Sequence, residues 1–164
     1  MKILSLVRHA KSCWKDLSLA DYERPLNKRG QRDAPRMGKR MAKRDARPEH
    51  ILSSPAVRAL TTAKVIAAEL GYKSTDVIVN EEIYGAGAGE LFEMIRNLDS
   101  RFDQIMLVGH NPALTDLVNL LAGSDIVNVP TCGVVVLGFQ TDSWMNMGIG
   151  TGKLLEFDYP KRSK

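Results

Sequence analysis

The sequence predicts an α/β fold: a three-layer sandwich with a mostly parallel central sheet and an antiparallel C-terminal edge. Short β-branched runs alternate with longer helical patterns, which is typical of βα units. The run 105–108 is continuously apolar, as central parallel strands tend to be. The last two strand candidates, 134–139 and 154–157, follow each other across a loop at 142–152 without a helix between them. We therefore expect these two strands to pair antiparallel.

The remaining elements follow in chain order. We expect further strands at 3–7, 51–53 and 77–79. The first helix is predicted to begin at Asp33, whose carboxylate can cap it, with Pro35 in the first turn. Ala34, Met37 and Met41 recur at the spacing of a buried helical stripe.

Three more helices are expected. One is capped by Ser54, opened by Pro55 and closed by Gly71. Its buried face is predicted to carry Val57, Leu60, Ala63, Ala67 and Leu70. Another runs over about 90–98 after a turn rich in glycine, and the last runs over about 111–123.

Length and composition predict one soluble domain over residues 1–164. With 164 residues and 44% hydrophobic content, one core is expected and disorder is excluded. No apolar run approaches the ~20 residues of a membrane span, and the N-terminus lacks a signal-peptide pattern. Cys13 and Cys132 have no CxxC spacing, so neither a disulfide framework nor a structural zinc site is suggested. We therefore expect a cytoplasmic protein.

The segment from Lys28 to Arg47 is strongly basic. It holds nine basic and two acidic residues, or +7, whereas the whole chain carries +4, which leaves −3 elsewhere. No aromatic residue lies within it to stack on bases, so a solvated helix face is favoured over a nucleic-acid site. Docking of an acidic protein stays open.

Common phosphate-binding motifs are absent. A P-loop at 148–153 fails because Met147 stands at the first glycine and Leu154 at the Ser/Thr position. The alternating glycines at 85–89 do not complete a dinucleotide fingerprint, because the last glycine position holds Glu90. Neither cysteine is followed by the arginine of a cysteine phosphatase, and no G-x-S-x-G nucleophile elbow occurs.

Two histidines occupy matching positions at predicted strand ends. His9 follows the first strand and His110 follows the buried strand 105–108. Ligands of open α/β sheets bind outside the carboxyl ends of the strands, so both rings can face one crevice. Arg8 and Arg58 can reach it too, and helix N-termini nearby attract anions. The set predicts a phosphoryl site. A two-histidine metal site lacks a third ligand, and the third histidine, His50, is interpreted as structural.

Three segments carrying these residues resemble the signatures of the histidine phosphatase superfamily, the phosphoglycerate-mutase-like group. They are Arg8-His9-Ala10-Lys11-Ser12, the stretch Ser53 to Ala63, and Gly109-His110-Asn111-Pro112. The short chain, and Arg24-Pro25-Leu26-Asn27 followed by Gly30, resemble its SixA-type phosphohistidine phosphatase branch. The resemblance runs from residue 1 to about 125 and implies a phosphoglycerate-mutase-like fold.

The resemblance also implies roles. His9 would be the nucleophile, Arg8 and Arg58 would clamp the phosphoryl oxygens, and His110 would donate to the same group. Arg24 would reach the phosphate from its loop, and Ser12 stands where the mutase branch has a serine near its substrate.

Two positions depart from the family pattern. The glycine after the nucleophile is Ala10 here, which is tolerable if its φ is negative. The segment from Asn80 to Gly85 resembles the mutase segment that bears the proton donor, and its spacing points to Glu81. Because the SixA branch does not reliably keep that acid, the donor stays unassigned.

Three functions follow as hypotheses, none requiring a metal or cofactor. The first is a phosphatase for phosphohistidine in a signalling or phosphotransfer protein, such as a histidine-phosphotransfer protein. The second is a phosphatase or mutase for a small phosphorylated metabolite. The third is a silent phosphate-binding or basic docking protein. No membrane partner is expected.

Overall fold

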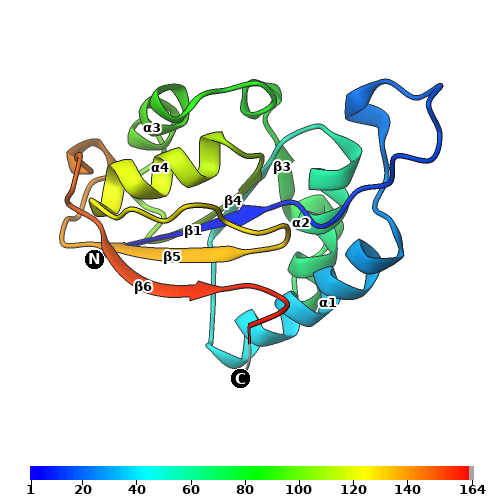
Figure 1. Cartoon of the computed structure of the whole chain (residues 1–164). Coiled ribbons are helices and arrows are strands. Elements are labelled where there is room, and N and C mark those ends of the chain that lie inside the picture. The colour runs from blue at the N-terminus through cyan, green and yellow to red at the C-terminus, as the bar shows by residue number, and fades with distance from the viewer. Residues whose placement is uncertain (163–164) are drawn as a thin grey trace.

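A computed structural model, which describes residues 1–162, has one mixed six-stranded sheet (Figure 1). The strand order is β3-β2-β4-β1-β5-β6. The first four strands in that order are parallel, and β5 and β6 add an antiparallel edge. The strands are β1 (Lys2–Arg8), β2 (His50–Ser53), β3 (Val77–Val79), β4 (Gln104–Gly109), β5 (Val134–Phe139) and β6 (Lys153–Asp158). The predicted fold class and all six predicted strands are confirmed.

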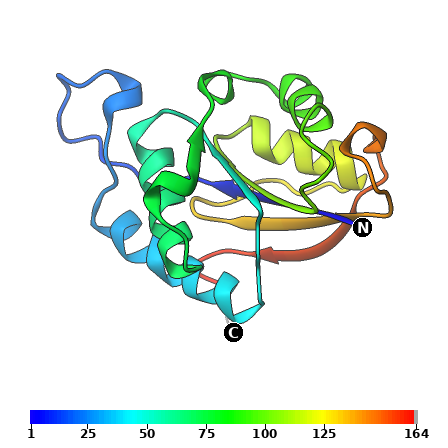
Figure 2. The same cartoon turned by 180° about the vertical axis from the view of Figure 1, so that it is seen from behind.

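Two layers of helices cover the sheet. Figure 2 shows α1 (Lys28–Lys43) and α2 (Val57–Glu69) packed side by side on one face, where they bury a cluster rich in alanine and methionine. On the other face lie α3 (Ala88–Arg96) and α4 (Ala113–Ala122), over a leucine-rich cluster. No described helix is long and apolar enough to cross a membrane.

The strand register brings the predicted site residues to one edge. Arg8, the last residue of β1, pairs with Gly109, the last residue of β4, so His9 and His110 leave the sheet side by side. On the other side of β4, Ser53 at the end of β2 pairs with Val108.

Helix α1 begins earlier than predicted. Asn27, not Asp33, is the N-cap, and its side chain accepts a hydrogen bond from the Gly30 N–H at 2.9 Å. Pro35 therefore lies inside the helix. The buried stripe explains why the helix continues through it: positions 34, 37 and 41 are at most 1% exposed, as predicted, and their burial outweighs one lost backbone hydrogen bond.

Helix α2 begins later than predicted, at Val57 with Ala56 as its N-cap. Ser54 still accepts a hydrogen bond from the Ala56 N–H at 3.2 Å, but it stands outside the helix. The buried face agrees with the predicted one at Ala63 and Ala67, which are fully buried, but Leu60 and Leu70 are only half-buried. Val57 is 39% exposed, whereas Arg58 is 6% exposed. Gly71 follows the helix end with φ +90°, as expected of a helix-terminating glycine.

Helix α3 spans 88–96 instead of about 90–98. Gly87 is the N-cap, and its N–H donates to the Glu90 carboxylate at 3.0 Å. Glu90 is therefore the third residue of the helix and not the first. Helix α4 begins at Ala113 after Pro112 and ends at Gly123, whose φ is +64°.

Candidate active site

His9 and His110 face each other at the carboxyl ends of β1 and β4, with their ring centroids 5.2 Å apart. His9 is 9% exposed, and its Nδ1 lies 2.7 Å from the carbonyl oxygen of Ala10. A carbonyl only accepts, so Nδ1 carries the proton and donates it. The other ring nitrogen, Nε2, is then left with its lone pair available for attack.

Both imidazoles are held neutral. Burial lowers the pKa of His9 to about 3, the hydrogen bond to the Ala10 carbonyl opposes this shift, and the positive charges of Arg58 and Arg8 add to it. Burial also lowers the pKa of His110 to about 4, assisted by Arg58 and Arg8 and opposed by Asp21. A neutral His9 is the form that can act as a nucleophile.

The end of β2 orients His110. Its Nε2 lies 2.7 Å from the Ser54 hydroxyl oxygen, and its ring meets the Tyr84 ring edge-on at 5.6 Å. Its Nδ1 is buried and has no hydrogen-bond partner among residues 1–162. When Ser54 donates to Nε2, the proton of the neutral ring sits on Nδ1, which becomes a donor without a partner. Such an orphaned donor is suited to a phosphoryl oxygen.

Arg8 and Arg58 reach the same place from β1 and α2. Arg8 donates from a terminal nitrogen to the Val129 carbonyl at 3.0 Å, and Arg58 donates to the backbone and carboxylate of Asp21 at 2.7 and 2.9 Å. The Nε of each arginine is buried without a partner in the described part of the chain. Buried N–H groups without acceptors are costly, so these donors mark a site that an anion can complete.

Arg24 and Ser12 lie beside this cluster and are linked to each other. Arg24 is 7% exposed, donates to the Ser12 hydroxyl at 2.8 Å, and stacks on the Trp14 ring with its guanidinium carbon 3.4 Å from the ring centroid. Ser12 therefore holds Arg24 in place, a role its sequence position did not indicate. The structure brings all six predicted site residues to one end of the sheet.

Asp21 and Tyr84 belong to the same cluster but were missed from the sequence. Asp21 begins the short 3₁₀ helix η1 (Asp21–Glu23), and Tyr84 follows η3 (Glu81–Ile83). The Tyr84 hydroxyl donates to the Asp21 carboxylate at 2.7 Å. That hydrogen bond is the main reason why the pKa of Asp21 is held below its ordinary range; Arg58 and Arg24 add to the effect, and partial burial opposes it.

Further residues fix the backbone around His9. Thr62 accepts a hydrogen bond from the Ala10 N–H at 3.0 Å and donates to the Arg58 carbonyl at 2.7 Å, which ties the nucleophile loop to α2. The Cys132 N–H donates to the His9 carbonyl at 3.0 Å from a backbone with φ +60°. Ala10 is fully buried and is not among the described residues with positive φ, so its methyl group is accommodated as expected.

An open groove of about 500 Å³ adjoins the cluster. Arg58 and His110 line it together with residues 83–87 and the start of α4. Glu81, the candidate acid, is exposed on η3 and does not line this groove.

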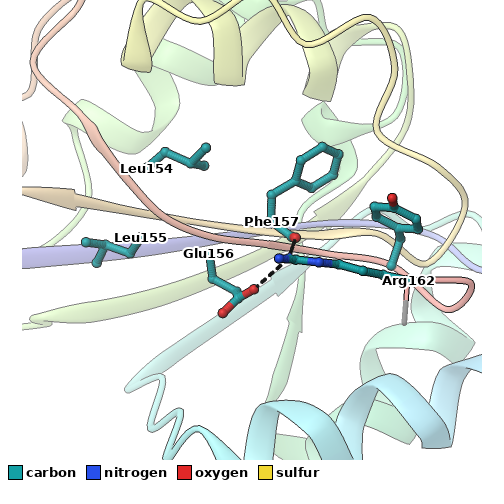
Figure 3. Close-up of a pocket in the computed structure, with 6 residues that line it drawn as sticks. Leu154, Leu155, Glu156, Phe157 and Arg162 are labelled. Carbon is teal, nitrogen blue, oxygen red and sulfur yellow. Dashed lines mark hydrogen bonds and ion pairs between the residues drawn. The ribbon is translucent and has the colours of Figure 1, made fainter. Parts of the chain in front are cut away.

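A second groove, along the edge strand β6, contains none of these residues (Figure 3). It is lined by Leu154, Leu155, Glu156, Phe157, Tyr159 and Arg162. The Arg162 side chain lies along the strand, donating to the Phe157 carbonyl and to Glu156. This second groove therefore lies along a sheet edge, and its lining residues bring no nucleophile or acid–base pair together.

The cluster is built for an anion. Within residues 1–162 no three His, Cys, Asp or Glu side chains gather as metal ligands. Three guanidiniums, two neutral imidazoles and one carboxylate leave a formal charge of about +2 there, which attracts a phosphoryl group.

The chain is similar to several known proteins. An uncharacterized chloroplastic protein of Arabidopsis thaliana is 34% identical over 149 residues, covering 86% of this chain and 68% of that protein. The structure of a proposed SixA phosphohistidine phosphatase from Agrobacterium tumefaciens matches with a TM-score of 0.83 and 27% identity, covering 97% of this chain and 98% of the other.

Two more distant structures share the fold. The protein histidine phosphatase SixA in complex with tungstate has a TM-score of 0.81 at 18% identity, covering 96% of this chain and 97% of the other. A mycobacterial glucosyl-3-phosphoglycerate phosphatase has a TM-score of 0.71 at 15% identity, covering 97% of this chain and 100% of the other. The model of the histidine phosphatase superfamily (branch 1) matches residues 4–98. The chain therefore belongs to the histidine phosphatase superfamily, and the comparisons support a phosphatase that acts through a histidine.

Proposed function

We propose that this protein hydrolyses phosphohistidine in a signalling or phosphotransfer protein, without a metal, through a phosphorylated His9. The observation that carries this proposal is the neutral His9 ring. Its Nδ1–H donates to the Ala10 carbonyl, which leaves a lone pair on Nε2, and Arg58 and Arg8 lie close enough to act electrostatically on the ring.

In the first step, the Nε2 lone pair of His9 attacks phosphorus as the bond from phosphorus to the substrate nitrogen breaks. That bond's electrons return to the leaving imidazole. A substrate ring protonated at its second nitrogen leaves as a neutral imidazole, and with an ordinary pKa of about 6.5 such a ring is substantially protonated near neutral pH. This step therefore needs no carboxylic acid, which fits the exposed position of Glu81.

In the second step, water attacks the phosphorus atom of phosphorylated His9. The bond to Nε2 breaks, its electrons return to the ring, and both protons of the water leave on the product phosphate. The Nε groups of Arg8 and Arg58 and the Nδ1–H of His110 are the unpartnered donors that can stabilise the oxygens in both steps.

The likeness to SixA structures supports phosphohistidine as the substrate. The proposed SixA protein from Agrobacterium tumefaciens matches over nearly the whole length of both chains. The groove beside His110 is open, and Trp14 and Tyr22 are 65% and 52% exposed on the neighbouring loop, which suits a protein-borne substrate. The mycobacterial metabolite phosphatase with the same fold keeps a small phosphorylated metabolite as the second candidate.

Phosphoryl labelling tests the proposal. Incubation with a ³²P-phosphohistidine protein, followed by a rapid denaturing quench, should label the chain with a base-stable, acid-labile group, and His9→Ala should abolish both label and turnover. His50→Ala is the matched control, because His50 stacks on Phe102 at 4.7 Å outside the site.

Three outcomes would contradict the proposal. Turnover that survives His9→Ala would refute the nucleophile. Higher kcat/KM for free phosphorylated sugars or acids than for the phosphohistidine protein would favour the second candidate. Activity lost in chelator and restored by a metal would refute the metal-free scheme.

A further inference from the structure

Asp21 is the most highly connected side chain at the mouth of the site. One carboxylate oxygen accepts from the Nε and a terminal nitrogen of Arg24 at 3.3 and 3.1 Å. The other accepts from Arg58 at 2.9 Å and from the Tyr84 hydroxyl at 2.7 Å. An ionised carboxylate offers about four acceptor sites, so these four donors use them all.

The four donors come from three different parts of the chain. Arg24 stands at the end of the loop 11–27, Arg58 is in the first turn of α2, and Tyr84 follows η3. Tyr84 also packs its ring edge-on against His110. Asp21 therefore connects both loop and helix arginines to the wall that supports the second histidine.

An anion in an anion-binding site can act in two opposite ways. It can occupy the place of the phosphoryl group and obstruct the site, or it can hold the arginines in the orientation that phosphoryl transfer requires. The contacts distinguish these. Asp21 takes only terminal nitrogens of Arg58, through its carboxylate and its backbone carbonyl, whereas Nε of Arg58 stays buried and unpartnered among residues 1–162. Nε of Arg58 therefore keeps an N–H donor without an acceptor among these residues, whereas Asp21 fixes the two terminal nitrogens.

Charge supports the same interpretation. Arg24 and Arg58 both contact Asp21 and repel each other, and a carboxylate between them offsets that repulsion. The side chain of Asp21 is 48% exposed, whereas those of both arginines are 8% exposed, so the carboxylate lies at the rim and the guanidiniums lie inside.

We propose that Asp21 is a positioning residue that aligns Arg24 and Arg58 for the transition state of phosphoryl transfer. This inference rests on the proposed function only in taking phosphoryl transfer as the reaction, not in the choice of substrate. It predicts that loss of the carboxylate lowers kcat without weakening ground-state anion binding, because a negative charge is removed while the alignment is lost.

The test compares Asp21→Asn with Asp16→Asn, the same chemical change in the same loop. Asp16 is exposed, and among residues 1–162 its carboxylate accepts hydrogen bonds only from Ser18, at 2.6 and 3.0 Å, so its variant should behave as the wild type. In Asp21→Asn an NH₂ group replaces one of the two carboxylate oxygens. An NH₂ group cannot accept a hydrogen bond, so either Arg24 or Arg58 loses its contact. We expect kcat for 4-nitrophenyl phosphate, whose nitrophenolate can leave without a proton, to fall about 10- to 100-fold, as for an ångström-scale misplacement.

Two oxyanions separate alignment from simple attraction without turnover. Calorimetry should show that Asp21→Asn binds inorganic phosphate at least as tightly as the wild type. Vanadate adopts the five-coordinate geometry of in-line transfer. The affinity of Asp21→Asn for vanadate should therefore fall by the same factor as its kcat. Tyr84→Phe removes one of the four donors but leaves both arginines bound to Asp21, so its decrease in kcat should be smaller than that of Asp21→Asn. In the double variant, Tyr84→Phe should lower kcat no further than Asp21→Asn alone.

Three results would overturn the inference. A rise in kcat/KM in Asp21→Asn would show that the carboxylate obstructs the site. Unchanged kcat and vanadate affinity with a lower melting temperature would show a purely structural role. If Asp21→Asn bound phosphate and vanadate more weakly by the same factor, Asp21 would contribute to ground-state anion binding and not to transition-state alignment. If the wild type lacks His9-dependent turnover, the proposed function fails, and the comparison of phosphate with vanadate still decides the role of Asp21.

Discussion

Lowering the pH from 7 to 5 should leave the His9 ring of the substrate-free protein neutral. A histidine with the ordinary pKa of about 6.5 would be only ~3% neutral at pH 5. Burial, assisted by the charges of Arg58 and Arg8, lowers the pKa of His9 to about 3, so ~99% of the ring should stay neutral at pH 5. The expected difference in nucleophile concentration is about thirtyfold.

The assay is an NMR titration of the histidine ring C–H signals from pH 8 to pH 4, with His9→Ala used to assign the His9 peak. We expect that peak to stay still above pH 5. Arg58→Met removes a positive charge, so its His9 peak should begin to shift at a higher pH than the wild-type peak, but its midpoint should stay below 6.5 because burial is the larger cause. A wild-type midpoint between 6 and 7 would refute the reasoning that burial keeps the nucleophile neutral.

Three further predictions follow from the structure. Arg58→Met should lower kcat about 10²–10³-fold in steady-state assays, as expected for loss of a preorganised charge donor. Gly30→Ala should destabilise the fold by about 1–3 kcal/mol in denaturant unfolding. The added Cβ would lie 2.2 Å from the Lys11 carbonyl oxygen, which must then move. Melting temperature should fall as pH drops from about 6.5 toward 4, because unfolded chains protonate His9 and His110 whereas folded ones, with pKa values of about 3 and 4, do not. His9→Ala should reduce that slope.

The strands were predictable because their signal is local. Each predicted strand is a β-branched or continuously apolar run, and the register of a parallel sheet then aligns the carboxyl ends. The helix starts were less predictable, since several polar residues compete as caps. Asp33 has the right chemistry for a cap, but Asn27 comes earlier and its side chain meets the Gly30 N–H, so the helix begins there.

The candidate site was predictable where a residue follows directly from a strand end. His9 and His110 stand one residue beyond β1 and β4, so topology alone places them together. Asp21 and Tyr84 belong to short 3₁₀ turns between the main elements. Their contact depends on the path of the loop 11–27, which no periodicity encodes. A carboxylate three residues before Arg24 was the only local signal for Asp21.

The charge of the site does not depend on groups that titrate near neutral pH. Both imidazoles have lowered pKa values and stay neutral, whereas the positive charge comes from three arginines and the negative charge from Asp21, whose pKa is also lowered. Between pH 5 and 8 the site therefore keeps its formal charge of about +2. A phosphate monoester changes its own charge in that interval, since its second ionisation has a pKa of about 6, and the ring of a phosphohistidine substrate gains or loses its proton there. The pH dependence of turnover should then follow the ionisation of the substrate and not that of the protein.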